Sequence, residues 1–104
     1  MALAPAAHAG TGNYIKITNS AGIVATTCYE WLGTSGADYC HQSWPVGESR
    51  TAYFPAGATS AVVNLKLSPW GAIRDSSAVT DASKNYCFEI QGLLGSEKLV
   101  KTGC

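Results

Sequence analysis

The stretch GIVATTCYEW, residues 22–31, repeats its apolar and polar side chains with a period of two. Successive side chains of a β-strand point to opposite faces, so every second residue lies on one face. One such face carries Ile23, Ala25, Thr27, Tyr29 and Trp31. The stretch therefore predicts a β-strand that buries this face against a core.

The same period recurs along the chain. It is found at residues 13–18 (NYIKIT), 49–54 (SRTAYF), 62–67 (VVNLKL) and 85–92 (NYCFEIQG), and 98–101 (KLVK) is a candidate last strand. Turn residues such as NSAG and PAGATS separate these stretches. Strands at this spacing favour a β-sandwich or a small barrel, and we expect an all-β, two-sheet antiparallel β-sandwich. Only residues 70–83 suggest a helical turn, capped by Asp81 or Ser83.

Length and charge narrow the class of protein. The chain has 104 residues, which suits a single domain. Charged residues make up 13% of it, and seven acids balance seven bases, so no net field attracts a phosphate backbone. We expect no nucleic-acid partner. No apolar run reaches the ~20 residues of a membrane-spanning helix, so no transmembrane segment is predicted.

The first nine residues, MALAPAAHA, end in a small-x-small pattern typical of a signal-peptide cleavage site. We interpret residues 1–9 as the remnant of a secretory signal and residues 10–104 as the mature domain of a secreted, extracellular protein. The alternative is an Ala-rich leader with no role in export.

Four cysteines in a short exported chain indicate two disulfides, for which three pairings are possible. The local pairs, Cys28 with Cys40 and Cys87 with Cys104, are favoured because each closes a short Gly-containing loop. A zinc site is the competing interpretation. It is disfavoured because no C-x-x-C occurs and His41 is the one histidine left after cleavage. We expect no metal and no cofactor.

A series of segments resembles a known family. The series is AGIVATTCYEW, Ser43-Trp44, RTAYFPAGATSAVVNLKL, Pro69-Trp70 and YCFEIQGLLG, in the order and spacing of the C-terminal β-sandwich domain of cholesterol-dependent (thiol-activated) cytolysins. The resemblance covers nearly all of residues 10–104. It implies a membrane-recognition module whose tip loops, including a Trp-rich undecapeptide, contact the bilayer. Here the domain is expected to stand alone, without the pore-forming domains.

Binding residues are expected in the loops. Trp70 lies in the turn after residue 67 and is either a plug over the core or an exposed tip residue. Leu93 and Leu94 lie between two glycines and are expected to be exposed beside it. Tyr39, inside the first disulfide loop, is a further candidate for contact or for packing. Trp31 and Trp44 are expected in the core or on a strand face.

The sterol-recognising Thr-Leu pair of the family would fall after Ile90, where this chain reads Gly92-Leu93-Leu94-Gly95. We therefore expect no sterol-dependent membrane binding and at most weak peripheral membrane contact. The isolated acids and the adjacent Cys40 and His41 provide no paired carboxylates or catalytic triad, so no enzymatic activity is expected.

Three hypotheses follow for function. The first is a secreted binding module whose tip loops recognise a cell-surface glycan or lipid or a partner protein. The second is an adaptor or accessory subunit of a larger, toxin-like secreted assembly. The third is an inhibitor of an extracellular enzyme that presents a rigid loop to a cleft.

Overall fold

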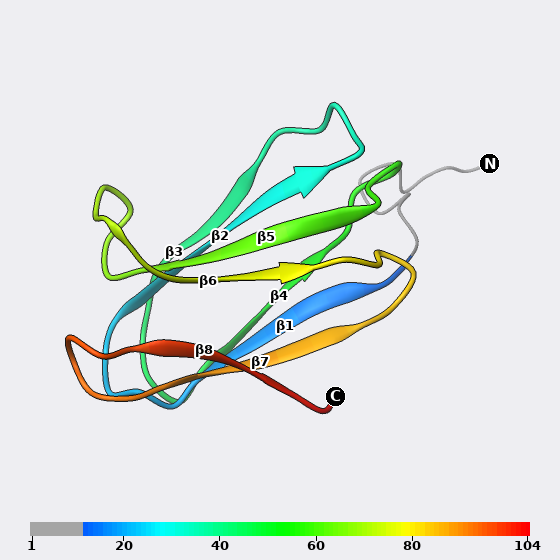
Figure 1. The fold of residues 1–104 in the computed structure, drawn as a ribbon. Coiled ribbons are helices and arrows are strands. Elements are labelled where there is room, and N and C mark those ends of the chain that lie inside the picture. Colours follow the sequence, from blue (N-terminus) through cyan, green and yellow to red (C-terminus); the bar gives the residue numbers. More distant parts are fainter. Residues whose placement is uncertain (1–11) are drawn as a thin grey trace.

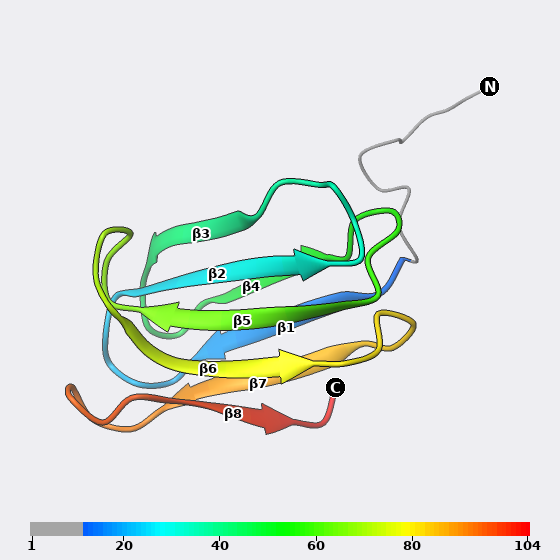
Figure 2. The same ribbon diagram turned by 45° about the horizontal axis from the view of Figure 1, so that its top comes forward.

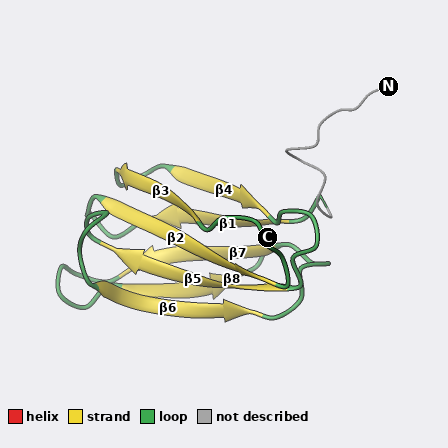
Figure 3. Cartoon of the chain, turned by 90° about the horizontal axis from the view of Figure 1, so that it is seen from above, coloured by secondary structure: helices red, strands yellow, loops and turns green. Residues whose placement is uncertain are grey.

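Eight β-strands and their connections make up residues 12–104, the part of the chain that the computed structural model describes (Figure 1). No helix occurs in this part, as Figure 3 shows. The predicted signal remnant, residues 1–9, lies outside the described residues. The strands are β1 (Tyr14–Asn19), β2 (Ala25–Leu32), β3 (Tyr39–Trp44), β4 (Ser49–Tyr53), β5 (Ser60–Lys66), β6 (Ile73–Val79), β7 (Tyr86–Gln91) and β8 (Lys98–Thr102).

The strands form two four-stranded sheets, in the orders β4-β1-β7-β8 and β3-β2-β5-β6. The predicted all-β, two-sheet sandwich is therefore confirmed. Neighbouring strands are antiparallel, except that β1 and β7 run parallel, with Ile15 opposite Tyr86 and Ile17 opposite Phe88. This pair can be parallel because the chain crosses to the other sheet and back between the two strands, instead of returning through a hairpin.

The helical turn expected within residues 70–83 is wrong, because β6 occupies the middle half of this segment and no helix occurs in the rest. Strand β6 pairs with β5 in register, with Ala61 opposite Val79. Strand β6 is an edge strand with mostly polar or exposed side chains. Its sequence therefore lacks the apolar–polar alternation that marks the other strands. The Asp81 carboxylate does act locally, by accepting hydrogen bonds from the Ser83 amide and hydroxyl at 2.9 and 2.5 Å. This contact shapes a turn, not a helix cap.

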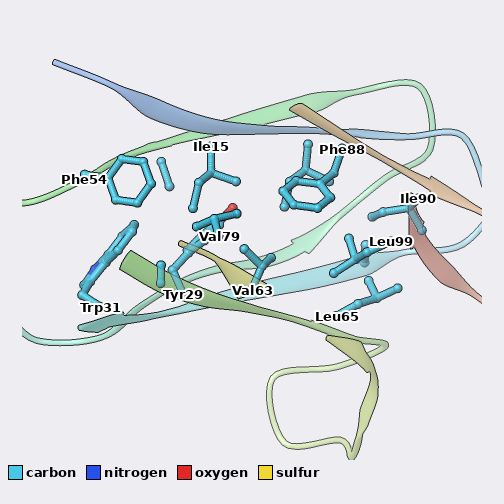
Figure 4. Close-up of a cluster of buried hydrophobic side chains, with 14 of the residues drawn as sticks. Ile15, Tyr29, Trp31, Phe54, Val63, Leu65, Val79, Phe88, Ile90 and Leu99 are labelled. Carbon is cyan, nitrogen blue, oxygen red and sulfur yellow. The ribbon is translucent and has the colours of Figure 1, made fainter. Parts of the chain in front are cut away.

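Apolar side chains from both sheets meet between them (Figure 4). The predicted inward faces are confirmed, since Ile15, Ile17, Tyr29, Val63 and Ile90 are all fully buried. Burial of each large side chain contributes about 1.5–3 kcal/mol, so this interior is the main source of stability. The other buried apolar residues are Ile23, Ala25, Trp31, Trp44, Ala52, Phe54, Ala58, Ala61, Leu65, Val79, Ala82, Phe88 and Leu99.

Polar groups inside the sandwich are paired. The Tyr29 hydroxyl lies 3.0 Å from Thr27 Oγ1 and 3.0 Å from His41 Nδ1, and Trp44 Nε1 donates to Thr27 Oγ1 at 3.4 Å. Burial raises the pKa of Tyr29 to about 12, so its phenol stays protonated and available for these bonds. Such satisfied contacts remove the cost of placing polar atoms in the core.

Both predicted disulfides are confirmed. Cys28 and Cys40 are register partners on β2 and β3, and Cys87 of β7 is joined to Cys104 just after β8. The first disulfide fixes the edge strand β3 to its sheet, and the second fixes the end of the chain. Closing short loops of this kind stabilises a domain by about 3 kcal/mol each in the chain-entropy model.

Candidate binding site at the loop end

Four connections meet at one end of the sandwich, which we call the loop end: residues 20–24, 45–48, 67–72 and 92–97. Backbone contacts hold them together. Gly47 N donates to Asn19 O at 2.8 Å, and Ser20 N donates to Ile90 O at 3.0 Å, which joins the ends of β1, β4 and β7. Figure 2 shows the β5–β6 and β7–β8 connections at this end and the C terminus toward the other.

Trp70 lies at the corner of a β-turn that starts at Ser68. Gly71 N donates to Ser68 O at 3.0 Å, and Pro69 occupies the second position, where its fixed φ favours the turn. A Cβ added to Gly71 would lie 2.9 Å from Ser68 Oγ, so the Ser68 side chain would have to rotate to admit a larger residue there. The Trp70 side chain points away from the sandwich and is 92% exposed. Of the two predicted alternatives, plug and tip, Trp70 is the tip residue.

Leu93 and Leu94 lie in a second tight turn, and their predicted exposure is confirmed at 79% and 73%. Ser96 N donates to Leu93 O at 2.8 Å, and Gly95 follows with φ of 97°, which matches a type II turn with glycine at its third position. Gly92 has φ of 103°, and a Cβ there would lie 2.5 Å from Ser96 O. The two glycines thus force the leucines outward.

A buried carboxylate joins these two turns across the sheets. The Glu97 side chain is 1% exposed; its Oε2 accepts from Gly95 N at 2.8 Å and its Oε1 from Arg74 Nε at 3.2 Å. Arg74 belongs to β6, so the contact links the hairpin that carries Trp70 to the hairpin that carries the leucines. The Gly95 amide lowers the pKa of Glu97 most; burial opposes this effect and Arg74 adds to it.

A hydrogen bond from a backbone amide to a carboxylate side chain joins the two sheets at the same edge. Leu99 N of β8 donates to Asp75 Oδ2 of β6 at 2.8 Å. The side chains of Trp70, Leu93 and Leu94, which we call the apolar tip, therefore extend from two turns with fixed backbones. A rigid apolar group loses little conformational entropy when a partner covers it.

Sequence reasoning missed two features of the loop end. Three more apolar side chains, Val24, Val46 and Ile73, are 51–53% exposed there. In the sequence, each of them is an apolar residue at or next to a turn. This pattern is weak evidence for a binding site, because single exposed apolar residues are common on protein surfaces. The role of Glu97 had no local signal, since its partner Arg74 is 23 residues away.

Tyr39 does not lie with the other predicted binding residues. It begins β3 opposite Tyr29 of β2, whereas the loop end lies beyond Trp44 at the other end of that strand. Its side chain is 50% exposed, and its ring lies 6.2 Å from that of Tyr29. The predicted site thus divides into the apolar tip and a separate position on the side of the sandwich.

No group of three or more His, Cys, Asp or Glu side chains gathers in residues 12–104 as a metal site would require. In the same residues, no helix is long and apolar enough to cross a bilayer.

The sequence matches no protein-family model and no curated protein. Similar folds are found among solved structures. The human-specific toxin intermedilysin matches with a TM-score of 0.54 and 15% identity, over 88% of this chain and 23% of the toxin. A disulfide-locked mutant of intermedilysin with human CD59 matches with a TM-score of 0.53 and 14% identity, over 86% and 24%. A trapped toxin matches with a TM-score of 0.56 and 11% identity, over 88% and 23%.

These matches confirm the expected resemblance to cholesterol-dependent cytolysins in fold. The chain spans about a quarter of the length of the toxins that it matches. At 11–15% identity the likeness concerns the β-sandwich alone, so the role of the loop end has to be argued from its own side chains.

Proposed function

We propose that this chain is a secreted, non-catalytic binding module that recognises a partner protein or a cell surface through its apolar tip. The observation that carries the proposal is the exposure of Trp70, Leu93 and Leu94, at 92%, 79% and 73%, on two turns that are each closed by a backbone hydrogen bond. Large apolar side chains left exposed on turns at one end of a domain are a common feature of interaction sites. The two disulfides are typical of an exported protein.

A protein is a better candidate partner for the apolar tip than a bilayer of plain lipid. Three side chains at ~2 kcal/mol each give at best micromolar partitioning into a bilayer once ordering is subtracted. Intermedilysin, whose fold this chain resembles, is known in a structure with human CD59, which supports a protein as the partner class. If the partner protein is another subunit of a secreted assembly, the chain acts as an adaptor.

The first test is flotation with phosphatidylcholine vesicles, with and without cholesterol. We expect the protein to stay with the soluble fraction in both cases, because the turn at residues 92–95 lacks the Thr-Leu pair of the sterol-binding toxins. Strong flotation with cholesterol vesicles would contradict this expectation and favour a sterol-dependent role.

The second test is capture of partners from the culture medium of the producing organism by immobilised protein. A partner held through the apolar tip should be lost with Leu94→Ala and with Trp70→Ala. The matched control is Leu32→Ala, because Leu32 is also an exposed leucine, at 47%, but ends β2 away from the loop end. Equal capture by all variants would exclude the apolar tip as the contact surface.

A further inference from the structure

Strands β3 and β4 are the edge strands of the two sheets on one side of the sandwich (Figure 3). Side chains from these strands and from β2 line a groove there. Its volume is about 490 Å³, within the range of small-molecule sites. The groove is separate from the apolar tip. It is lined mainly by Trp31, Tyr39, His41, Thr51, Tyr53 and Pro55.

The groove exists because the two sheets separate at this edge. The register places Tyr39 opposite Tyr29 and His41 opposite Thr27, on the inner face of the β3-β2-β5-β6 sheet. Inner-face residues of a closed sandwich are covered by the facing sheet. Tyr39 is nevertheless 50% exposed. At the opposite edge, the hydrogen bond from Leu99 N to Asp75 Oδ2 joins the two sheets, so the separation is specific to the β3 and β4 side.

Aromatic contacts hold the wall of the groove in place. The rings of Trp31 and Tyr29 stack with centroids 5.6 Å apart, and the ring of Tyr39 continues the row 6.2 Å from Tyr29 at an interplanar angle of 18°. The His41 ring meets Tyr39 edge to face at 4.9 Å. The exposed face of Tyr39 is therefore a preformed platform, which reduces the entropy that a ligand would have to offset.

The lining of the groove carries hydrogen-bonding groups without formal charge. No Lys, Arg, Asp or Glu among the described residues lines it. Burial, and then the nearby Arg50, lower the pKa of His41, so its imidazole is neutral near pH 7. Tyr29 Oη is hydrogen-bonded to His41 Nδ1 at 3.0 Å, which leaves Nε2 for a ligand. The Thr51 hydroxyl and the phenol of Tyr39 add groups that both donate and accept.

We propose that this groove binds a neutral sugar ring of a glycan. The C–H face of a pyranose packs on the electron-rich face of an aromatic ring, as the Tyr39 platform offers, and its hydroxyls pair with groups that donate and accept. An anionic sugar or a phosphate would find no cation among the residues that line the groove, since the nearby Arg50 guanidinium lies over the Trp44 ring and pairs with Glu48. The site would give the module a second contact with a glycosylated surface, independent of the apolar tip.

An extended peptide fits the groove less well. A peptide that adds a strand needs a long regular edge, and the β2–β3 ladder is regular only from Tyr39 to His41 before it shifts register between Thr27 and Ala25. Ser43 near that shift has φ of 51°, which further distorts the edge of β3. A proline-rich peptide would use the aromatic wall and could accept hydrogen bonds from the hydroxyls through its carbonyls, but it has few N–H groups to donate in return, whereas sugar hydroxyls do both. Peptide binding is therefore the competing outcome of the test.

The test is a two-dimensional ¹H–¹⁵N NMR titration of the protein with neutral disaccharides: lactose, maltose, cellobiose and N,N′-diacetylchitobiose. We expect at least one to give saturable shifts, in the millimolar range, centred on Tyr39, His41 and Tyr53. Tyr39→Ala should weaken this binding at least about tenfold because the platform is lost. Thr51→Val keeps the side-chain volume but removes the hydroxyl, and it should weaken binding severalfold. This second variant tests the proposal even if Tyr39→Ala fails to fold.

Trp70→Ala is the control, and its sugar affinity should equal that of the unmodified protein. Absence of saturable shifts with all four sugars would overturn the proposal. Shifts centred on the loop end would overturn it too, and so would unchanged affinity in both Tyr39→Ala and Thr51→Val. Saturable binding of a proline-rich decapeptide to the groove without sugar binding would replace it with a peptide site. The role of the apolar tip is unaffected by each of these outcomes.

Discussion

Tryptophan is buried in the interior of the sandwich but exposed at its loop end. Trp44, the last residue of β3, is 1% exposed, whereas Trp70, in the β5–β6 turn, is 92% exposed. In a strand, alternation decides which side chains face the core, and Trp44 lies on the inner face. In a tight turn the backbone geometry decides, and Trp70 occupies a corner from which the core is out of reach. Hydrophobicity alone therefore does not predict burial in this chain.

The side chains that stabilise the fold are different from those proposed to bind a partner. The interior tryptophans fill space between sheets, so removing one leaves a cavity. The apolar tip fills no space within residues 12–104, so removing one of its side chains leaves the fold unchanged. Between these extremes lies Glu97, which is buried but supports the loop end. Three substitutions measure this gradient.

Trp44→Ala should have the largest effect on stability. The substitution removes a fully buried indole, its bond to Thr27 Oγ1 and its contact with Arg50, whose guanidinium carbon lies 5.2 Å from the ring centroid. We expect a loss of about 3–5 kcal/mol in the free energy of unfolding, measured by urea denaturation. A loss below about 1 kcal/mol would mean that this side of the interior is loosely packed, contrary to the comparison.

The interior was predictable from the sequence, because alternation acts over neighbouring residues. Ile15, Ile17 and Tyr29 face the core as their period of two predicts. Where alternation fails, prediction fails as well. Residues 73–79 of β6 read as a helical turn because an edge strand with polar contacts, such as Ser76 Oγ donating to Asn64 Oδ1 at 2.6 Å, needs no apolar face.

The candidate sites were predictable in part. The glycines around Leu93 and Leu94 signalled a turn and hence exposure, and the structure bears this out. The sequence left Trp70 open between plug and tip because the direction of a turn side chain depends on how the two sheets end. It placed Tyr39 among the candidates but could not separate it from the tip. That separation depends on the register and direction of β3, which place Tyr39 at the end of the strand opposite to the loop end.

Glu97→Gln should have an intermediate effect. An amide can keep one hydrogen bond but loses the charge that Gly95 N and Arg74 stabilise, so we expect a loss of about 1–3 kcal/mol near pH 7. The control is Glu48→Gln. Glu48 pairs with Arg50 at the surface, with half of its side chain exposed, and its replacement should cost less than about 1 kcal/mol. Equal effects of the two substitutions would show that Glu97 supports nothing at the loop end.

The pH dependence of stability tests the same carboxylate. The pKa of Glu97 in the folded protein lies below its ordinary value of 4.5, so its contribution is complete above that pH and is lost as the pH falls through the folded-state pKa. Urea denaturation between pH 7 and pH 3 should therefore show a shallower acid decline for Glu97→Gln than for the unmodified protein. Parallel acid limbs for the two proteins would assign the decline to other carboxylates.

Trp70→Ala should have the smallest effect on stability and the largest on recognition. Because the indole is 92% exposed, its removal exposes no cavity, and the free energy of unfolding should change by no more than about 0.5 kcal/mol. The water-exposed component of the tryptophan fluorescence should disappear, while the emission of the buried Trp31 and Trp44 remains, which verifies the fold of the variant. Capture of the partner should fall sharply, since a tip aromatic is the residue type that most often dominates an interface. A variant that loses stability by 3 kcal/mol or more would instead identify Trp70 as a plug, and one that keeps both stability and capture would move recognition away from the loop end.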